Sequence, residues 1–527
     1  MGASGNQPAK FNTTLAILLA MAMFVLVVDT SIMNVSISAV VRDIGTTASG
    51  IQSAIALEAL VSAAFILIGS KVGDLIGRKR AYVIGLLCYA AGAIAMTLTQ
   101  SLLPIIIFWA VIGGLGASLL LPSMQSLIHG NFQGDHQKRV YALVGASAAI
   151  AAAVGPLIGG VITTFLSWRI AFLMEAVIIA IVLLGIKLVH DVPYTGERRI
   201  DLVGALLSVL GMGGIVIGIL VWQEGGEAVG ALIAVGLLGL GSLAFWLRRR
   251  KREGRPTLLD PSLFRSSGFR LGATQQMLQQ IALGGSMIVL PMYLQMVLGY
   301  DALGAGLSIA PLSLSMFAVA MIAGRTGKGR PATLILWGFI LLTLGMVALI
   351  PIVPRAESGW LLLGPLVVAG SGLGLLVSQL NNFTLSPISD ERVSEAAGVN
   401  SAAGSFGLSF GLAFAGAIML AALSLIFTSM AMSSSVLPAD DKETVARVLE
   451  DDAQIMSNEG LEQLVADEPE EIQDEIIRIN TEARPIALQI ALLIPIGAGL
   501  IGLFNSFLIR RLPDPKSSGS GERMLLD

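Results

Sequence analysis

Charge, cysteine and histidine are all scarce in this sequence of 527 residues. Only 13% of the residues are Asp, Glu, Lys or Arg, whereas soluble domains carry about a quarter of charged residues. The single cysteine, Cys88, lies in an apolar run, which excludes an intrachain disulfide and makes thiol chemistry unexpected. The three histidines are too few and too dispersed to form a metal set, so we expect neither a metal site nor a cofactor.

Motifs of soluble enzymes are absent or lack their context. The chain has no P-loop of the Walker type, so ATP hydrolysis by this chain is not expected to drive its work. Residues 407–411 read GLSFG and match the hydrolase nucleophile pattern, but that pattern needs a strand-to-helix elbow and a His partner. We therefore expect no enzymatic activity. The enzyme alternative, a membrane acyl or glycosyl transferase, would need a His/Asp pair or an acidic cluster near a membrane surface.

Long apolar runs dominate the chain instead. Hydrophobic residues make up 54% of it, and the mean hydropathy is +0.80. The runs have the length, about 18 to 25 residues, that crosses the hydrocarbon core of a bilayer as a helix, and the 60 glycines suit close helix packing in lipid. Fourteen spans are predicted, at 14–36, 51–69, 81–100, 104–128, 139–163, 170–189, 201–222, 228–247, 271–297, 303–324, 332–353, 359–384, 396–428 and 486–509.

The loops between these spans differ in charge on the two sides of the membrane. The side that holds both termini has 26 of the 33 Lys and Arg residues, and the other side has seven. Because cytoplasmic loops are rich in Lys and Arg, we predict a multi-pass protein of the cell (plasma or inner) membrane with both termini in the cytoplasm. An odd number of spans would remove this asymmetry.

The segment between the last two spans is long and acidic. Residues 433–485 contain 15 Asp and Glu against four Lys and Arg, on the predicted outer side. Residues 467–469, Asp-Glu-Pro, are typical of a helix start, because acids and Pro favour the first turn. Apolar residues also recur here at helical spacing, so we predict a small acidic helical hairpin. It could cap the exit, bind an extracytoplasmic partner, or be a solvated loop of no special function.

A short loop joins the second and third predicted spans and reads GSKVGDLIGRKR over residues 69–80. It combines small residues, one acid at a helix end and a basic cluster near the headgroups. The loop closely resembles the signature of the major facilitator superfamily. The resemblance implies that Asp74 latches one of the alternating-access states across the two halves of the protein, with Arg78 as its basic partner. The gating-loop residues so implied are Gly73, Asp74, Gly77, Arg78 and Lys79.

The fifth predicted span carries Gly155, Pro156, Gly159 and Gly160. Pro removes a backbone donor and kinks a helix, while Gly lets another helix approach closely. This stretch resembles the antiporter motif of the same superfamily, which is associated with proton-linked exporters rather than importers. The resemblance therefore favours export.

Further pieces are similar to the fourteen-span drug:proton antiporter branch of that superfamily. They are VDTSIMNV at 28–35, SWR at 167–169, DLVG at 201–204, LFR at 263–265 and LQMVLG at 294–299. The likeness covers nearly the whole chain apart from 433–485. It implies an all-α polytopic membrane protein with two six-helix bundles, two extra spans and a cavity between the bundles near the midplane.

This resemblance also implies a division of the chain. The predicted parts are a cytoplasmic N-terminus at 1–13, a six-helix bundle at 14–189, two linker spans with a basic cytoplasmic loop at 190–270, the first five spans of the second bundle at 271–432, the acidic extracytoplasmic insertion at 433–485, the last span at 486–509 and a disordered cytoplasmic tail at 510–527.

Three acids lie inside predicted spans, where an ionisable group costs roughly 3 kcal/mol or more and is a functional candidate by default. Asp29, Glu58 and Glu175 share a depth of roughly 8–11 Å from the outer ends of their spans, counted at 1.5 Å per residue. The family normally has an Arg for proton coupling in the fourth span, where this chain has Ala110. The candidates for proton coupling and substrate binding are therefore the three acids and Asn34. Glu58 or Glu175 could instead be a protonated packing residue.

Amides are concentrated in the second half. Gln275, Gln276, Gln279 and Gln280 form two pairs spaced four residues apart on one helix face. Four primary amides are not expected to face lipid, so they line the cavity or a helix contact. Asn381 and Asn382 are candidates to face them.

Together these features predict a secondary active transporter, a proton-coupled exporter of drugs or other amphipathic small molecules that works by alternating access. Its partners would be a small-molecule substrate, protons and the bilayer, without nucleic acid. Two alternatives are an exporter of an endogenous metabolite or lipid with different coupling, and a transporter-derived sensor or assembly partner that uses 433–485 as its binding module.

Overall fold

The computed structural model describes residues 12–132, 134–191, 201–223, 226–326, 330–356, 358–388, 392–438 and 469–512, together with Lys442, Val445, Leu461 and Ala466. Every regular element within these ranges is a helix. The predicted N-terminal segment 1–13 and the tail 510–527 lie largely outside the described residues, as does most of 439–468 in the acidic segment.

The first half is formed by six spans. Polar caps start several of them: Asn12 accepts a hydrogen bond from the Leu15 backbone N–H, and Thr47 accepts one from Gly50. Each cap satisfies a backbone donor that would otherwise be unpaired at the helix start. The spans are α1 (Thr13–Ile44), α2 (Ala48–Ile76), α3 (Arg78–Leu98), the composite of α4 (Leu102–Pro104), η1 (Ile105–Gly113) and α5 (Gly114–Asn131), then α6 (Gly134–Phe165) and α7 (Trp168–Leu184).

Two accessory helices follow, α8 (Leu202–Gln223) and α9 (Val229–Arg252), and they pack against each other. Asp201 holds this pair together from a buried position. It accepts hydrogen bonds from the Gly204 backbone and from the indole of Trp246, both at 3.0 Å, and lies 3.4 Å from the guanidinium of Arg250. Because α8 also packs against α2 of the first half and α14 of the second, the accessory pair contacts both halves.

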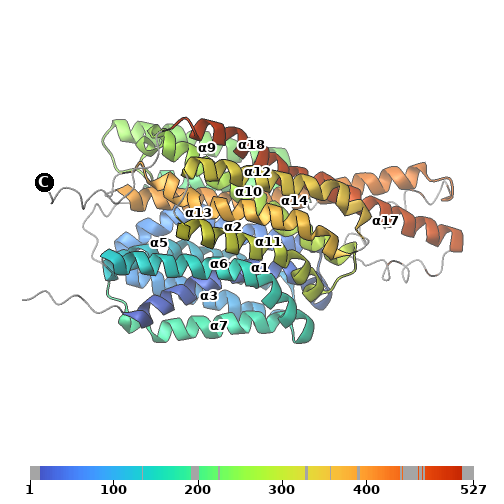
Figure 1. Cartoon of the computed structure of the whole chain (residues 1–527), viewed down its shortest axis with the longest axis horizontal. Coiled ribbons are helices and arrows are strands. Elements are labelled where there is room, and N and C mark those ends of the chain that lie inside the picture. The colour runs from blue at the N-terminus through green and yellow to red at the C-terminus, as the bar shows by residue number, and fades with distance from the viewer. Residues whose placement is uncertain are drawn as a thin grey trace, which may run out of the picture.

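The second half contains the remaining spans. Its helices are α10 (Ser267–Met296), α11 (Ala302–Thr326), α12 (Pro331–Ile352), α13 (Leu363–Leu385), α14 (Val393–Ser433), α17 (Glu470–Ala491) and α18 (Leu493–Ile509), with short 3₁₀ turns η3 (Pro261–Arg265) before α10 and η5 (Gly359–Leu362) before α13. The helices of both halves run side by side along one long axis (Figure 1).

Thirteen helices of the described residues are long and apolar enough to cross a membrane. They correspond to thirteen of the fourteen predicted spans. The remaining prediction, 170–189, falls on α7, which has 17 residues and ends in a 3₁₀ turn at Ile186–Leu188. A helix of 17 residues lies at the short end of the range that spans a bilayer, about 17–25 residues.

We name the two ends of the helix bundle after the parts of the chain that lie there. The terminal side is where α1 begins and α18 ends, and the far side is where α1 ends and α11 begins. On the far side the halves touch directly: the Ser38 hydroxyl donates to Gln295 of α10, and the Leu303 backbone N–H donates to Thr164 at 3.1 Å. The halves are therefore in contact at their far-side ends.

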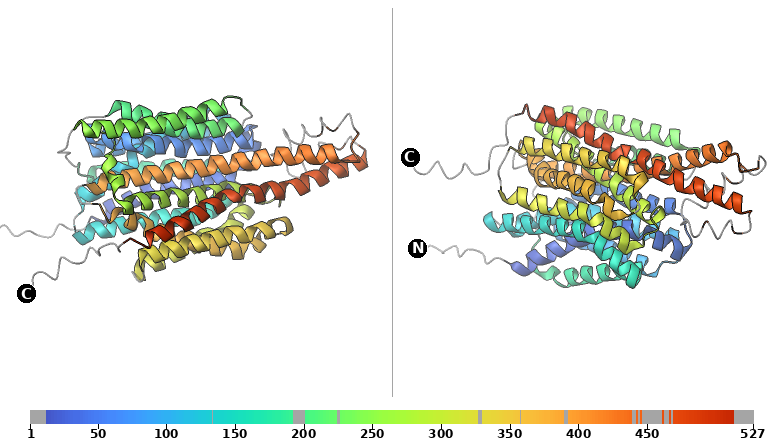
Figure 2. Two further views of the ribbon diagram at one scale, coloured as in Figure 1. Left: turned by 90° about the horizontal axis from the view of Figure 1, so that it is seen from above. Right: turned by 45° about the vertical axis from the view of Figure 1, so that its right-hand side comes forward.

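The described ends of the acidic segment extend two helices of the bundle, and the predicted hairpin falls largely on 439–468, mostly outside the described residues. The helix α14 has 41 residues, about 60 Å at 1.5 Å per residue, which is about twice the thickness of the hydrocarbon core. Its end projects beyond the bundle together with α17, as both views of Figure 2 show. The boundary predicted at 485/486 lies inside α17, which runs on to Ala491. We call this paired extension of α14 and α17 the projection.

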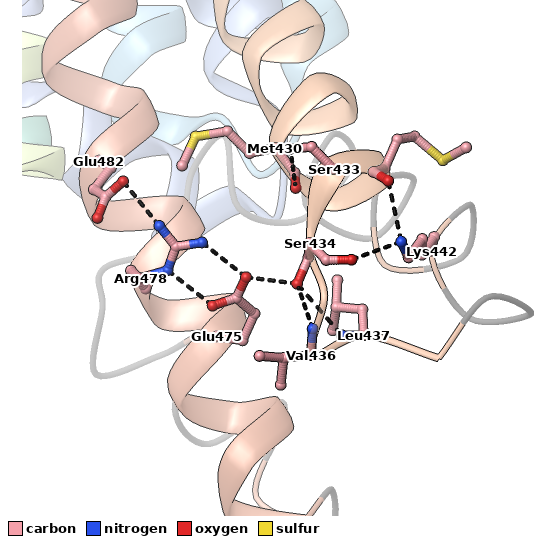
Figure 3. Close-up of polar contacts among 10 residues, drawn as sticks. Met430, Ser433, Ser434, Val436, Leu437, Lys442, Glu475, Arg478 and Glu482 are labelled. Atoms are coloured by element: carbon pink, nitrogen blue, oxygen red, sulfur yellow. Dashed lines mark hydrogen bonds and ion pairs between the residues drawn. The ribbon is translucent and has the colours of Figure 1, made fainter.

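Apolar packing and a polar clamp hold the projection together. Phe427 and Ala431 of α14 pack with Ile476, Ile479 and Ala483 of α17, all of them buried. At the tip, the Ser434 hydroxyl donates to Glu475 at 2.6 Å, and Arg478 donates to both oxygens of Glu475 at 2.8 Å (Figure 3). The predicted start of a helix at Pro469 agrees with the first residue of α17, Glu470.

Candidate functional site

Asp29 on α1 is the centre of a buried polar cluster in the first half. Its carboxylate is fully buried. The hydroxyl of Tyr89 on α3 donates to it, and the indole Nε1 of Trp109 lies 3.0 Å from each carboxylate oxygen. Because both donors are neutral, these bonds hold the carboxylate in place without cancelling its charge.

Trp109 reaches Asp29 from an irregular part of the fourth span. Residues 105–113 form a π-helix, a rare geometry that is frequent at functional sites. The neighbouring Ala110, at the position where the resemblance implies an Arg, is fully buried. The indole packs edge-on against Phe172 of α7, with ring centroids 6.4 Å apart. The fourth span thus offers Asp29 an indole N–H next to the position where the family pattern has a cation.

Glu58 and Glu175 lie within electrostatic range of Asp29. Glu175 on α7 is 2% exposed, and among the described residues neither of its carboxylate oxygens has a hydrogen-bond partner. Glu58 on α2 is 7% exposed. All three carboxylates interact electrostatically with the hydroxyl of Tyr89. The structure therefore brings the three predicted acids together from α1, α2 and α7.

This arrangement can hold a positive charge. Burying an ionised carboxylate without a partner costs several kcal/mol of free energy, on the order of what several hydrogen bonds contribute to stability. Negative charge at Glu175 must therefore be balanced by a bound proton or a bound cation.

Sequence reasoning identified the three acids but missed Tyr89 and Trp109. Their signal was a polar aromatic side chain inside an apolar span, where its O–H or N–H needs a partner.

Asn34 lies five residues beyond Asp29 on α1 and is 2% exposed. Within the described ranges its Oδ1 has no hydrogen-bond partner. The carbonyl oxygen of the next residue, Val35, accepts a hydrogen bond at 3.2 Å from Gln295 of α10. Asn34 therefore lies beside the contact between the two halves, and its role in substrate binding stays a prediction.

The gating loop is a tight turn on the terminal side. Gly77 has a φ of +99°, a conformation that glycine adopts without steric cost. Asp74 and Arg78 form a buried ion pair across this turn, and Arg78 also donates to the Ser70 carbonyl oxygen at 3.2 Å. Gly73 leaves room for the pair, because a Cβ there would lie 3.2 Å from the Arg78 guanidinium.

Lys79 ties the gating loop to the end of the first half. Its backbone N–H donates to Asp191 at 3.0 Å, and its Nζ donates to the Val189 carbonyl oxygen at 2.7 Å. The two residues that these hydrogen bonds join to the loop, Asp191 and Val189, follow the last helix of the first half. The helix α2 itself packs along α14 of the second half, so a latch across the halves stays a prediction that this proximity permits.

The glycines of the fifth span lie at a three-helix junction. A Cβ on Gly155 would lie 2.6 Å from the Cβ of Ser31, and one on Gly159 would lie 3.0 Å from the Cα of Ile32, so both glycines admit α1. A Cβ on Gly160 would lie 2.7 Å from the carbonyl oxygen of Ala302 on α11. The motif therefore joins the helix that carries Asp29 to the second half of the protein.

The amides of the second half are divided between two contacts. Gln275 donates to the Gly502 carbonyl oxygen at 2.9 Å and to Ser506 at 2.8 Å, which attaches α10 to α18. Gln276 and Gln280 lie against Gly404 of α14. Gln279 is buried and donates weakly to Gln280 at 3.4 Å.

The two asparagines of α13 do not contact these glutamines by any bond that the structure gives for the described residues. Asn381 and Asn382 are exposed, and Asn381 accepts a hydrogen bond at 3.3 Å from the buried Asn400 of α14. The structure thus assigns Gln275 to a helix contact, and a cavity role for the other amides stays a prediction.

Comparison with known proteins places the chain in a family. The sequence model of the Major Facilitator Superfamily matches residues 19–412. The multidrug resistance protein Stp of Mycobacterium tuberculosis is 29% identical over 77% of this chain and 75% of its own length. The cephamycin export protein CmcT of Amycolatopsis lactamdurans is 30% identical over 76% and 84%. The multidrug export protein EmrB of Escherichia coli is 27% identical over 75% and 78%.

Solved structures agree on the fold. A bacterial homologue of the human lysosomal transporter Spinster, in an inward-facing and unoccupied conformation, superposes with a TM-score of 0.65 at 12% identity, covering 97% of this chain and 100% of that one. This likeness concerns the fold alone. The drug-resistance and export names of the relatives confirm the resemblance drawn from the motifs. The protein is therefore a multi-pass membrane transporter, not an enzyme, and it belongs to the Major Facilitator Superfamily.

Proposed function

We propose that the protein exports amphipathic small molecules from the cytoplasm by alternating access, and that protons entering through the cluster of Asp29, Glu58 and Glu175 drive the export. The names of the relatives, which include multidrug and antibiotic exporters, support the class of cargo. The observation that carries the coupling is the buried carboxylate of Glu175, which within the described part of the chain has no hydrogen-bond partner. Such a group needs a proton or a cation to balance its charge.

The orientation follows from charge. The loops of the terminal side hold 26 of the 33 Lys and Arg residues, so we place that side in the cytoplasm and the far side outside. In the state described here the halves meet on the far side. Opening of these far-side contacts would expose the cluster to the outside, where a carboxylate takes up a proton; closing them and parting the terminal side would release the proton into the cytoplasm.

The antiporter motif gives this cycle a mechanical link. Gly155 and Gly159 let α6 lie directly on the segment of α1 that carries Asp29, while Gly160 lets α6 lie on α11. A movement of α11 relative to the first half therefore shifts α6 and, through it, the surroundings of Asp29. Proton binding at the cluster and the relative position of the halves thereby become coupled. A cationic cargo would compete with the proton for the same negative charge.

Proteoliposomes with Glu58→Gln test this proposal. With an imposed pH gradient and the cationic dye ethidium as cargo, we expect the variant to lose uphill transport but to keep exchange of labelled for unlabelled dye, because exchange needs no net proton movement. Glu471→Gln, which removes an exposed acid from α17, is the matched control and should behave as the unaltered protein. Undiminished uphill transport by Glu58→Gln would show that Glu58 is only a packing residue.

Exchange also separates the alternatives. A sensor or assembly partner would move no dye in either assay. An exporter with different coupling would transport dye uphill in response to another ion gradient and would be indifferent to the three carboxylates. If the unaltered protein shows neither uphill transport nor exchange of the dye, the proposed export itself is wrong.

A further inference from the structure

A polar network joins the far-side ends of three helices of the first half. The carboxylate of Asp43, in the last turn of α1, accepts a hydrogen bond at 2.9 Å from the indole Nε1 of Trp168 and forms an ion pair with Arg169. Both partners lie at the start of α7. Arg169 also donates at 2.6 Å to the carbonyl oxygen of Thr99, the residue that follows α3. We call Asp43, Thr99, Trp168 and Arg169 the far-side anchor.

A row of aromatic rings leads from this anchor to the carboxylate cluster. Phe172, one turn after Trp168, packs edge-on against it with ring centroids 6.0 Å apart. On its other side Phe172 packs edge-on against Trp109, with centroids 6.4 Å apart, and all three residues are buried. At 1.5 Å per residue, Asp43 lies about 21 Å beyond Asp29 along α1. The row therefore connects two carboxylates of the same helix, each of which accepts a hydrogen bond from one indole N–H.

The indole of Trp109 needs support from outside its own span. It lies in the π-helix at 105–113, where the backbone does not give side chains the rotation of a regular α-helix. Its Nε1 lies 3.0 Å from both oxygens of Asp29, so a small tilt of the ring would weaken one of the two contacts. Functional side chains keep such geometry when neighbouring side chains lock their rotamers. Phe172 is in the place to do this.

We propose that Trp168 and Phe172 are positioning residues for the carboxylate cluster. The far-side anchor fixes the ring of Trp168, and this ring fixes Phe172. Phe172 in turn holds the indole of Trp109 on Asp29. Apolar packing alone would not require an ion pair and a second bond from an indole to a carboxylate at the outer end of the row. The effect on transport rests on the proposed proton coupling, whereas the positioning itself does not.

Fluorine NMR of the full-length protein in detergent, with 5-fluorotryptophan at all six tryptophans, tests the positioning without a transport assay. Trp109→Phe assigns the resonance of Trp109. We expect Asp43→Ala, at the opposite end of the row, to move this resonance by more than its linewidth, because the ring of Trp168 loses its anchor. Asp43→Asn keeps an oxygen acceptor for that indole and should restore most of the original position. Arg42→Ala, which removes a neighbouring exposed charge, is the control and should change nothing.

Transport separates positioning from packing. Phe172→Leu should lower uphill transport of the dye roughly tenfold and leave exchange nearly unchanged, since misplacing a positioned group by about 1 Å can cost up to ~100-fold in rate. Phe339→Leu removes an equally buried ring from α12 in the second half, and any loss it causes should be the same in both assays. If Phe172→Leu does not fold, Trp168→Phe replaces it, because this variant keeps a ring in the row and removes only the bond to Asp43.

Two results would overturn the proposal. One is a Trp109 resonance that does not move in Asp43→Ala, and the other is an equal loss of uphill transport and exchange in Phe172→Leu, which would show that Phe172 only packs. If the unaltered protein moves no dye, the proposed export fails, and the Trp109 resonance in Asp43→Ala still decides the positioning.

Discussion

In the first half of the transporter, three acids from different helices lie within electrostatic range of one buried tyrosine, whereas in the second half a buried glutamine, Gln275, attaches one helix to another. Asp29 accepts hydrogen bonds from the hydroxyl of Tyr89 and the indole of Trp109, both of them neutral donors. Gln275, by contrast, is bonded to the backbone and side chain of α18. Under the proposed coupling, the first half would respond to protons and the second half would be the frame against which it moves.

The largest expected effect separates these two kinds of buried polar residue. Asp29→Asn should lower the initial rate of pH-driven transport by about two orders of magnitude, the usual loss when a positioned proton-transfer group is removed. Gln279→Leu, at an equally buried position of the second half, should leave the rate within a few-fold of normal. Initial rates in proteoliposomes measure both. Equal losses in the two variants would contradict the division between the halves.

An intermediate effect is expected where the halves meet. Gly160→Leu and Gly306→Leu each place a side chain against the backbone of the other half, so we expect the far-side ends to separate and transport to fall about tenfold, because a close-packed contact cannot absorb the added volume without shifting. Spin labels at Thr46→Cys and Asp301→Cys in a Cys88→Ala background report the separation. Gly241→Leu is the control, since a Cβ there meets nothing within 4 Å. An unchanged distance distribution in both interface variants would refute the contact.

The smallest effect concerns the ion pair of Glu475 and Arg478 in the projection. The hydrogen bond from Arg478 lowers the pKa of Glu475, while its partial burial opposes this shift. A carboxyl group with a lowered folded-state pKa stabilises the fold above its unfolded pKa, about 4.3, and loses that contribution as the pH falls through the folded value. Acidification below about pH 4 should therefore loosen the pairing of α14 and α17.

Glu475→Gln should reproduce this loosening at neutral pH, with a cost of about 1 kcal/mol for the weakened hydrogen bonds to Ser434 and Arg478. Limited proteolysis of the projection, compared between pH 7 and pH 4, measures it, and transport by the variant should be nearly normal. Glu471→Gln serves as the matched control on the same helix. A variant whose protease sensitivity still rises on acidification as in the unaltered protein would show that Glu475 is not the responsible group.

Sequence reasoning was most successful where a signal is carried by one helix alone. Hydropathy located the thirteen helices that are long and apolar enough to cross a membrane, because the thickness of the bilayer imposes a length on each apolar run. In the acidic segment a helical hairpin was predicted, and it stays a prediction because most of 439–468 lies outside the described residues. The apolar positions of α17, among them Ile476 and Ile479, were recognised, and in the described residues they pack against the end of α14, a partner that the sequence did not indicate.

The candidate site shows the same limit. The three intramembrane acids were visible in the sequence, because charge in an apolar run is costly and stands out. Tyr89 and Trp109 were not identified, since an aromatic residue in a span is usually a packing residue until its neighbours are known. The sequence left open whether Gln275 lines a cavity or a helix contact, and only the position of Ser506 on α18 assigns it to a contact.

The sequence by itself therefore determined the class, the positions of the thirteen long apolar helices and the family likeness of this protein. Each of these depends on composition along one segment or on a motif of consecutive residues. The tertiary structure alone decided which side chains face one another: that a π-helical turn brings an indole to Asp29, that Gly160 meets the backbone of α11, and that Gln275 is bonded to α18. The reason is that hydropathy specifies that a helix lies in the membrane but not its rotation about its own axis, which is set by the packing of neighbouring helices.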